Sequence, residues 1–324
     1  MQKTRERGLK ILFAGTPEMA VPSLNALADN FEVVGVLCAS DSRSGRHKKK
    51  IAPSVKIAAE KRALPVLQPE RLDTEARTQA AALGAQLLVV FAYGRLFGPR
   101  FLALFAEGGI NLHPSALPQF RGPSPITAAI LAGCSHTAIS VQRVALKMDA
   151  GDILIQKSFS LKGNETTASL SAALSHAAAP ELVRAVNDII GKRLNPVPQN
   201  ESNATYCKPV LKNDGLINWG LHASQLERMV RAYNPWPTAH TSMNGISLAI
   251  LEAALIESPS LSAGTKAPGT VLGVDRSRGI LVQTGKNILV LKQLQLATRR
   301  PLGFRAFLNG TRLKTGMILG SPCE

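Results

Sequence analysis

The sequence predicts an α/β fold: a doubly wound, mostly parallel sheet of the Rossmann-like kind, followed by a small C-terminal β-barrel of the OB-like kind. Short apolar runs alternate with helical patterns over residues 1–194, as strands and crossover helices do in parallel sheets. A polar segment with three prolines follows at 195–214 and indicates a linker. From 215 to 324 the pattern changes to short strands separated by turns, which favours a small barrel.

The N-terminal elements begin with Leu9–Ala14, an apolar run that ends at Gly15. Pro17 suits the first turn of the helix that follows, because proline lacks the N–H that an N-terminal turn leaves unpaired. The remaining predicted elements are, in chain order, strand 33–37, helix 54–62, a strand near Val66, helix 73–83, strands 86–91, 109–113, 139–144 and 153–159, and helix 166–190. Ligand sites of such sheets lie beyond the carboxyl ends of the strands.

The C-terminal region begins with one predicted helix, 221–233, and continues with short strand patterns after Pro237. These predicted strands are 247–255, 269–274, 280–283 and 287–296. Together with the preceding region they predict three parts: an α/β domain at 1–194, the linker at 195–214 and a barrel domain at 215–324.

Composition limits the classes of function. The chain has 324 residues, of which 45% are hydrophobic, so it can build the cores of two ordinary domains. No apolar run approaches the length of a membrane span, and no signal-peptide pattern opens the chain. The four cysteines are far apart without metal-ligand spacing, which indicates a reduced, cytoplasmic protein without disulfides or a zinc site.

Charge points to a polyanionic partner. Lys and Arg number 38 against 22 Asp and Glu, a formal charge of +16. No acid occurs from Arg276 to Cys323, and a second basic cluster lies at 43–50. Only 5% of the residues are aromatic, so contact with the phosphates of a folded nucleic acid fits better than stacking on many bases.

Asn111 and His113 form the most informative local pattern. They alternate with Ile110 and Leu112, so on a strand they face the same side. Pro114 has no N–H for a sheet ladder and should end the strand there. An amide and an imidazole at a strand end can hold an oxygen that gains negative charge, or can simply be two polar caps, and these residues alone favour neither interpretation.

Motifs downstream of His113 resemble those of the formyltransferases that use 10-formyltetrahydrofolate. In that family an Asn-x-His precedes a Ser-Leu-Leu-Pro, an Arg-Gly, a Pro-Ile and, about three dozen residues after the His, an Asp-x-Gly-Asp. The corresponding elements here are Ser115-Ala116-Leu117-Pro118, Arg121-Gly122, Pro125-Ile126 and Asp149-Ala150-Gly151-Asp152.

The resemblance implies Asn111, His113 and Asp149 as catalytic residues, with Ser115, Ala116, Leu117 and Pro118 as folate-binding residues. It implies 10-formyltetrahydrofolate as a consumed co-substrate and no metal. Formyl transfer to an amine passes through a tetrahedral intermediate, for which Asn111 and His113 would donate N–H groups. Asp149 would take a proton from the amine, orient a water that does so, or fix the tautomer of His113. By pattern alone it could instead cap a turn before Gly151.

Within this family the chain most resembles the members that formylate methionyl initiator tRNA. The resemblance covers nearly the whole chain and rests on segments 14–18, 45–49 and 231–237. It implies methionyl initiator tRNA as the partner, with Arg46 as an acceptor-stem contact; we expect a monomer without membrane association. The basic loop that would meet the phosphates contains Arg43, Arg46, Lys48, Lys49 and Lys50.

Two alternatives remain open at this stage. One is a folate-dependent formyltransferase for an amino sugar nucleotide or another small amine, which would not need the basic loop. The other is a nucleic-acid-binding protein that has kept the fold without catalysis, although all three predicted catalytic residues are present. The chain departs from the family pattern at His47, Ala116, Gln119, Pro123, Ser124, Ala145 and Lys147.

Overall fold

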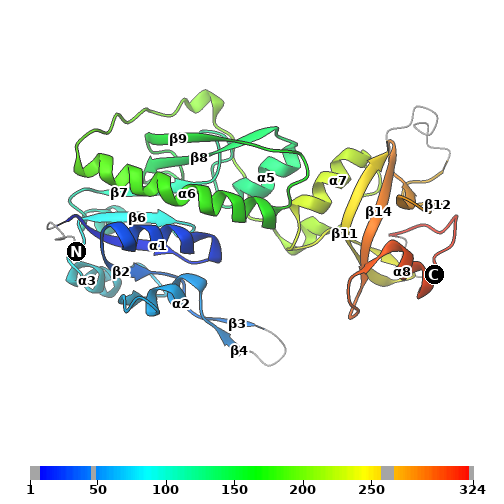
Figure 1. Cartoon of the computed structure of the whole chain (residues 1–324), viewed down its shortest axis with the longest axis horizontal. Helices are drawn as coiled ribbons and strands as arrows, with labels where there is room; N and C mark the ends of the chain where they lie inside the picture. The colour runs from blue at the N-terminus through cyan, green and yellow to red at the C-terminus, as the bar shows by residue number, and fades with distance from the viewer. Residues whose placement is uncertain (1–7, 45–48, 257–265, 321–324) are drawn as a thin grey trace, which may run out of the picture. The chain divides into compact units, whose positions relative to one another are not determined.

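The computed structural model describes residues 8–44, 49–256 and 266–320 (Figure 1). The backbone divides into two units. Unit 1 consists of Met1–Pro125, His136–Ser160 and Ser171–Lys208, and unit 2 consists of Ile126–Ser135, Leu161–Leu170 and Pro209–Glu324. No helix among the described residues is long and apolar enough to cross a bilayer.

Unit 1 contains a seven-stranded sheet in the order β5-β2-β1-β6-β7-β8-β9. Its strands are β1 (Lys10–Gly15), β2 (Glu32–Leu37), β5 (Val66–Leu67), β6 (Leu87–Phe91), β7 (Gly109–His113), β8 (His136–Arg143) and β9 (Ile153–Ser160). The neighbouring strands β5, β2, β1, β6 and β7 pair in parallel, which confirms the predicted mostly parallel α/β sheet. Strands β8 and β9 are antiparallel, because the short segment 144–152 between them cannot make a parallel crossover.

The parallel strands are apolar throughout because helices or loops cover both of their faces. Ile11, Leu12 and Phe13 of β1 have no exposed surface, and all five residues of β6 are buried. Gly15 ends β1 where a Cβ would meet the carbonyl oxygen of Phe91 at 2.8 Å, so only glycine fits beside β6 there. This packing fixes the strand ends that carry the candidate site.

The helices of unit 1 follow the predicted alternation. They are α1 (Val21–Asn30), α2 (Ser54–Glu60), α3 (Thr74–Ala82) and α6 (Thr167–Ile190), which begins in unit 2. The short α4 (Pro99–Leu102) was not predicted. Buried Leu174, Ala178 and Leu182 lie four residues apart on α6 and form one apolar face. Helices α6 and α1 run side by side (Figure 1), and the Ser175 hydroxyl donates to the carbonyl of Met19, just before α1, at 2.6 Å.

A two-stranded hairpin, β3 (Ser42–Ser44) with β4 (Lys49–Ile51), projects from the same unit. The sequence did not predict these strands, because all their residues except Ile51 are polar and leave no apolar alternation. The hairpin flanks residues 45–48, which lie outside the described residues.

Unit 2 contains an antiparallel sheet in the order β10-β11-β14-β13-β12, with β15 beside β14. Its strands are β10 (His240–Met243), β11 (Ile246–Ile256), β12 (Val271–Asp275), β13 (Gly279–Gln283), β14 (Ile288–Leu296) and β15 (Leu302–Gly303). Its helices are α5 (Pro125–Ala132), which starts at the end of unit 1, α7 (Ala223–Ala232) and α8 (Phe304–Asn309). The sequence missed the short elements β10, β15, α5 and α8.

The C-terminal segment joins the two edges of this curled sheet. The amide of Val271 donates to the carbonyl of Met317, and the amide of Leu319 donates to the carbonyl of Gly269, both on the β12 side. The amide of Gly320 donates to the carbonyl of Ser242 in β10. These bonds give the sheet the OB-like form that the sequence predicts.

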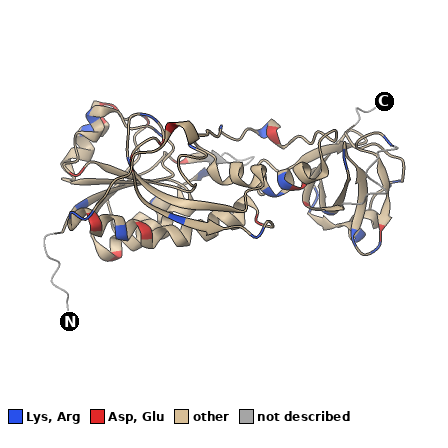
Figure 2. Cartoon of the chain, turned by 90° about the horizontal axis from the view of Figure 1, so that it is seen from above, with Lys and Arg blue, Asp and Glu red and all other residues tan. Residues whose placement is uncertain are grey.

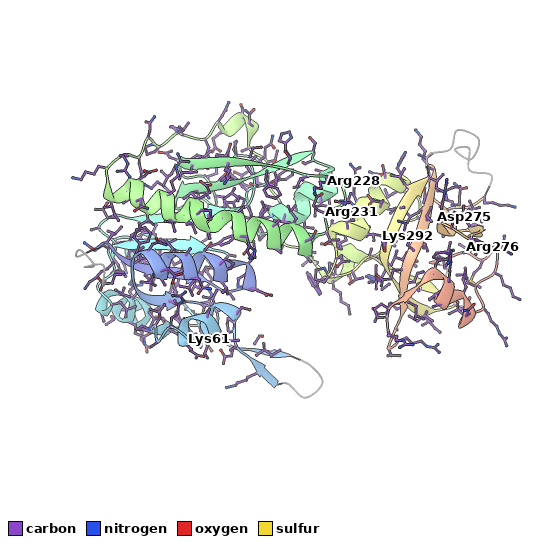
Figure 3. All side chains as sticks on the ribbon, in the orientation of Figure 1. Lys61, Arg228, Arg231, Asp275, Arg276 and Lys292 are labelled. Carbon is purple, nitrogen blue, oxygen red and sulfur yellow. The ribbon has the colours of Figure 1, made fainter. Side chains whose placement is uncertain are left out.

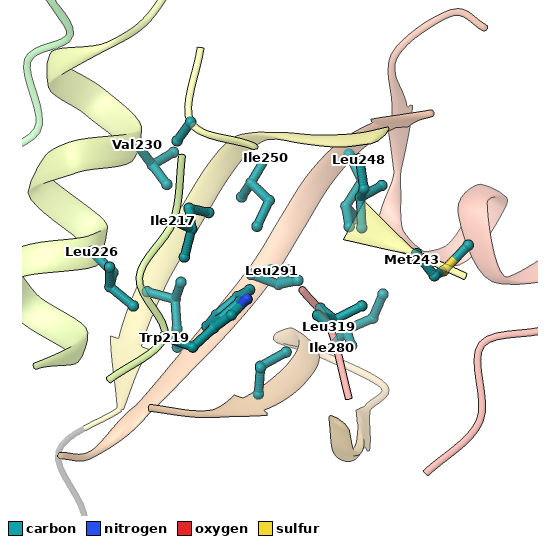
Figure 4. Packing of buried hydrophobic residues seen from close by; sticks show 14 of the residues in the cluster. Ile217, Trp219, Leu226, Val230, Met243, Leu248, Ile250, Ile280, Leu291 and Leu319 are labelled. Carbon is teal, nitrogen blue, oxygen red and sulfur yellow. The ribbon is translucent and has the colours of Figure 1, made fainter. Parts of the chain in front are cut away.

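The core of unit 2 lies between α7 and the inner face of the sheet (Figure 4). Leu226 and Val230 of α7 are almost fully buried there, with Ile250 of β11 and Leu291 of β14. Trp219 is 6% exposed, and its indole N–H donates to the Thr241 hydroxyl at 3.1 Å. A buried indole therefore keeps a hydrogen-bond partner.

Candidate active site

Strand β7 places Asn111 and His113 on one face of the sheet, as the alternation predicted. Parallel β6 pairs Val90 with Asn111 on one side of it. The neighbouring residues Ile110 and Leu112 are buried on the opposite face. The side chain of His113 is only 6% exposed, so its partners decide its charge and tautomer.

On the other side of β7, antiparallel β8 brings two more polar side chains to this face. Gln142 is the register partner of Asn111, and Ser140 is the register partner of His113. Directly opposed residues share a face of the sheet. Gln142 is 1% exposed and Ser140 is fully buried, so both belong to the interior of the site.

Asp149 lies on the turn between β8 and β9 and has a φ of 51°, in the left-handed region. The amide of Arg143 donates to the carbonyl of Asp152 at the base of this turn. A Cβ at Gly151 would collide with the backbone carbonyl of Arg143, so the turn can close this tightly only with glycine there. The turn directs the Asp149 carboxylate toward β7.

The structure brings the three predicted catalytic side chains together at the Asp149 carboxylate. Oδ1 accepts hydrogen bonds from Asn111 Nδ2 at 3.2 Å and Gln142 Nε2 at 3.0 Å. Oδ2 accepts one from the backbone amide of Gly122 at 2.9 Å and lies 3.5 Å from His113 Nδ1. The carboxylate side chain is 12% exposed, and N–H donors surround its negative charge.

The tautomer of His113 follows from its second nitrogen. Nε2 lies 2.8 Å from the carbonyl oxygen of Phe120, which can only accept, so Nε2 carries a proton. Burial lowers the pKa of the His113 imidazole, while the Asp149 charge and the Phe120 hydrogen bond oppose that shift. In the neutral ring Nδ1 therefore has a lone pair that faces Asp149, and a proton there would be shared with the carboxylate.

The predicted folate-binding residues form the first part of loop 114–122. The Ser115 hydroxyl donates to the carbonyl of Gln119 at 2.6 Å, and Ser115 is fully buried. Leu117 is 3% exposed, and its amide donates to the Ser140 hydroxyl. Ser115 and Leu117 thus hold the loop in shape, whereas Ala116 and Pro118 are partly exposed. Their assignment to folate stays a prediction.

Sequence reasoning missed a polar cluster around Arg121, whose side chain is fully buried. Its guanidinium donates to Gln199 Oε1 at 2.8 Å, to Glu201 Oε1 at 2.7 Å and to the Tyr206 hydroxyl at 3.0 Å. Lys147 Nζ donates to the other Glu201 oxygen at 2.7 Å. Arg121 and Lys147 hold the pKa of the Glu201 carboxyl at about 2.

Segment 199–207 lies within the predicted linker and contacts loop 114–122. The amide of Phe120 donates to the Thr205 hydroxyl, and the amide of Arg121 donates to the Thr205 carbonyl, both at 2.9 Å. The amide of Cys207 donates to the carbonyl of Arg121 at 2.8 Å. The only sequence signal for this cluster was the Arg121-Gly122 motif, because its partners come from a segment without apolar periodicity.

The predicted tRNA-binding residues lie on and between β3 and β4. Arg46 and Lys48 fall outside the described residues. The backbone pairs Arg43 with Lys50 and Ser44 with Lys49. Lys50 is exposed in the middle of β4.

Unit 2 contains a second set of basic residues, whose positions along the backbone are blue in Figure 2. Arg276 follows Asp275 at the end of β12 (Figure 3). In β14, Lys292 Nζ lies 3.3 Å from Glu252 Oε1. The exposed basic residues of the acid-free tract are Arg276, Arg278, Lys286, Arg299, Arg300, Arg305, Arg312 and Lys314.

The described residues contain no group of three or more His, Cys, Asp or Glu side chains that could hold a metal ion. Among them, Cys38, Cys134 and Cys207 are free thiols. Cys323 lies outside the described residues.

Comparison with known proteins identifies relatives along nearly the whole chain. The formyl transferase family model matches residues 9–186, and the model of the formyl transferase C-terminal domain matches residues 209–312. A methionyl-tRNA formyltransferase of Treponema denticola is 42% identical over 312 residues, covering 94% of this chain and 97% of that protein. One of Chloroflexus aurantiacus is 40% identical over 304 residues, covering 93% and 97%.

Solved structures share the fold at lower identity. An N-formyltransferase of Helicobacter canadensis, in complex with folinic acid and dTDP-3-aminofucose, superposes with a TM-score of 0.63. It is 17% identical and covers 90% of this chain and 100% of that chain. At this identity the likeness supports the fold alone.

Proposed function

Because the chain belongs to the formyl transferase family, we propose that it transfers a formyl group from 10-formyltetrahydrofolate to the α-amine of methionyl initiator tRNA. The full-length relatives are named methionyl-tRNA formyltransferases, and their similarity covers both units of this chain. The observation that supports the chemistry best is the convergence of Asn111, His113 and Asp149 within hydrogen-bond or ion-pair distance.

We assign Asn111 to the oxygen of the transferred formyl group. Its amide carries two N–H groups, and the bond to Asp149 uses one of them. The other can donate to that oxygen as negative charge develops on it. A fixed donor of this kind typically contributes about 100- to 1000-fold in rate.

His113 and Asp149 are assigned to the proton that leaves the attacking amine. Since Nε2 of His113 is engaged with Phe120, Nδ1 is the nitrogen that can accept a proton. Asp149 Oδ2, 3.5 Å away, would stabilise the imidazolium that forms or take the proton itself. A positioned acid–base pair contributes about 100- to 10,000-fold.

The residues at this strand edge fit a formyl-folate co-substrate, which supplies the formyl group and is consumed. Asn111 and His113 offer polar contacts beside the reacting carbon. Leu96, in the loop after β6, is 58% exposed and offers apolar surface for a planar ring. Because β6 and β7 are parallel neighbours, their carboxyl ends open on the same edge.

Recognition of tRNA is assigned to the basic loop with Arg43, Arg46, Lys48, Lys49 and Lys50, and to the cations of unit 2. The latter surround an OB-like sheet, a form that binds nucleic acids in other proteins. We further propose a catalytic domain at 1–194 and a tRNA-binding barrel at 215–324, acting as a cytoplasmic monomer.

Incubation of the purified protein with charged initiator tRNA and 10-formyltetrahydrofolate tests the proposal. We expect formyl-methionine on the tRNA and none on an amino sugar nucleotide supplied as a competing acceptor. Formylation of the nucleotide instead would replace the proposed substrate, and analytical ultracentrifugation would test the monomer.

A further inference from the structure

We propose that Gln199 is a positioning residue, which holds the turn carrying Asp149 and sets the orientation of the Gln142 amide against its carboxylate. This role rests on the proposed function only in that Asp149 is taken as catalytic. Gln142 and Asp149 lie 7 residues apart, and Gln199 follows Asp149 by 50 residues.

The orientation of the Gln199 amide is set by Arg121. A guanidinium has donors and no acceptor. Arg121 Nε and Nη2 lie 3.1 and 2.8 Å from one amide atom of Gln199, which must therefore be its oxygen. Arg121 is fully buried and is held in turn by Glu201 and Tyr206, so the Gln199 oxygen has a fixed partner.

The amide nitrogen of Gln199 then faces the Asp149 turn. Nε2 lies 2.9 Å from the carbonyl oxygen of Asp149 and 2.6 Å from that of Gly151. It thus holds the backbone on both sides of Ala150, where Asp149 has a left-handed φ of 51°. A single side chain can therefore keep a strained turn closed.

The same nitrogen sets the orientation of Gln142. It also lies 3.1 Å from Gln142 Oε1, and because an amide nitrogen has two N–H groups for these three acceptors, one N–H is shared. A Gln142 nitrogen at that place would set donor against donor, so Gln142 presents its oxygen there and its nitrogen faces the other way. That nitrogen donates to Asp149 Oδ1 at 3.0 Å. If the Gln142 amide turned over, its oxygen would face the carboxylate and the bond would be lost. Gln199 and the Asp149 carboxylate therefore favour the same orientation of Gln142, and Arg121 fixes the orientation of Gln199.

The test substitutes Gln199 with methionine, which keeps its length and removes the hydrogen bonds. We expect kcat for formylation to fall about 100-fold, the usual effect of a misplacement near 1 Å. The KM values for tRNA and for the folate co-substrate should stay within about twofold, because Gln199 is not assigned a contact with either. Gln79→Met, on the exposed face of α3, is the matched control and should change neither.

Two further measurements separate positioning from a general loss of structure. Gln199→Glu keeps the oxygen for Arg121 but sets a second oxygen against the Asp149 and Gly151 carbonyls, so it should lower kcat at least as much. The double variant Gln142→Met/Gln199→Met should be no slower than the slower single variant, because both changes remove the same hydrogen bond to Asp149.

Amide hydrogen exchange of peptide 144–152 gives a readout that needs no substrate. We expect faster exchange in Gln199→Met than in the parent protein, with no change in Gln79→Met. Unchanged exchange, unchanged kcat, or a raised KM with normal kcat would overturn the positioning role. If the parent protein fails to formylate tRNA while the exchange difference is present, the proposed function fails and the structural part of this role stands.

Discussion

Substitution of Asp149 with asparagine separates the charge of this side chain from its shape. The Asp149 carboxylate faces three N–H donors, from Asn111, Gln142 and Gly122, and the imidazole of His113. An amide has one oxygen, which can serve Asn111 and Gln142 together. Its nitrogen would then face His113 Nδ1, to which it can donate, and the Gly122 amide, to which it cannot.

The expected magnitudes follow from these contacts. One buried N–H, that of Gly122, loses its acceptor, which should lower the free energy of unfolding by about 1–3 kcal/mol. The lost charge can no longer accept a proton or stabilise the His113 imidazolium, so kcat should fall by about 100- to 10,000-fold. The binding of tRNA should be unaffected, because the basic residues assigned to it are untouched.

Single-turnover formylation, filter binding of charged tRNA and urea unfolding measure the three quantities. Asp73→Asn is the matched control: Asp73 caps α3 by accepting from the amide of Ala76, and asparagine caps a helix equally well. Full turnover of Asp149→Asn would refute the assignment of Asp149 to the proton. A parallel loss of activity in Asp73→Asn would attribute the effect to instability.

Three further predictions address charge and packing. Burial lowers the pKa of His113 in the folded protein, so the unfolded chain binds a proton on this imidazole more tightly than the folded chain does. The free energy of unfolding should therefore decrease as the pH falls below about 6.5, by at most about 1.4 kcal/mol per pH unit. Titration of unfolding in the parent and in His113→Gln should show a flatter dependence in the variant; equal slopes would contradict it. Gly151→Ala should destabilise the protein by about 1–3 kcal/mol in urea, because its Cβ would collide with the Arg143 carbonyl. Gly310→Ala should lose less, because its φ of −106° suits alanine and its Cβ would make only van der Waals contact. Arg46→Ala and Lys50→Ala should each reduce the slope of log affinity for tRNA against log salt concentration by about one and leave the KM for the folate co-substrate unchanged. Weaker binding of both tRNA and folate would instead indicate that the loop has a structural role.

Local sequence patterns were sufficient for the framework of the fold. The apolar runs at Leu9–Ala14 and 86–91 became β1 and β6 within a residue or two, because buried parallel strands need continuous hydrophobic residues. The predicted helix 166–190 corresponds to α6, because a helix that covers a sheet needs one continuous apolar face. Short polar elements such as β3, β4 and β10 were missed, since pairing with a neighbour rather than their own composition makes them strands.

For the candidate site, the sequence determined that Asn111 and His113 share a face, because the period of a strand is two. Family motifs added Asp149, but no pattern could bring it to them. Tertiary structure decides the antiparallel register of β7 and β8, which sets Gln142 beside Asn111. It also decides the hydrogen bonds of Gln199 to the Asp149 turn. The groups that donate hydrogen bonds to the carboxylate lie between 7 and 38 positions from it, and such contacts leave no local periodicity, so only the folded chain shows which side chains surround it.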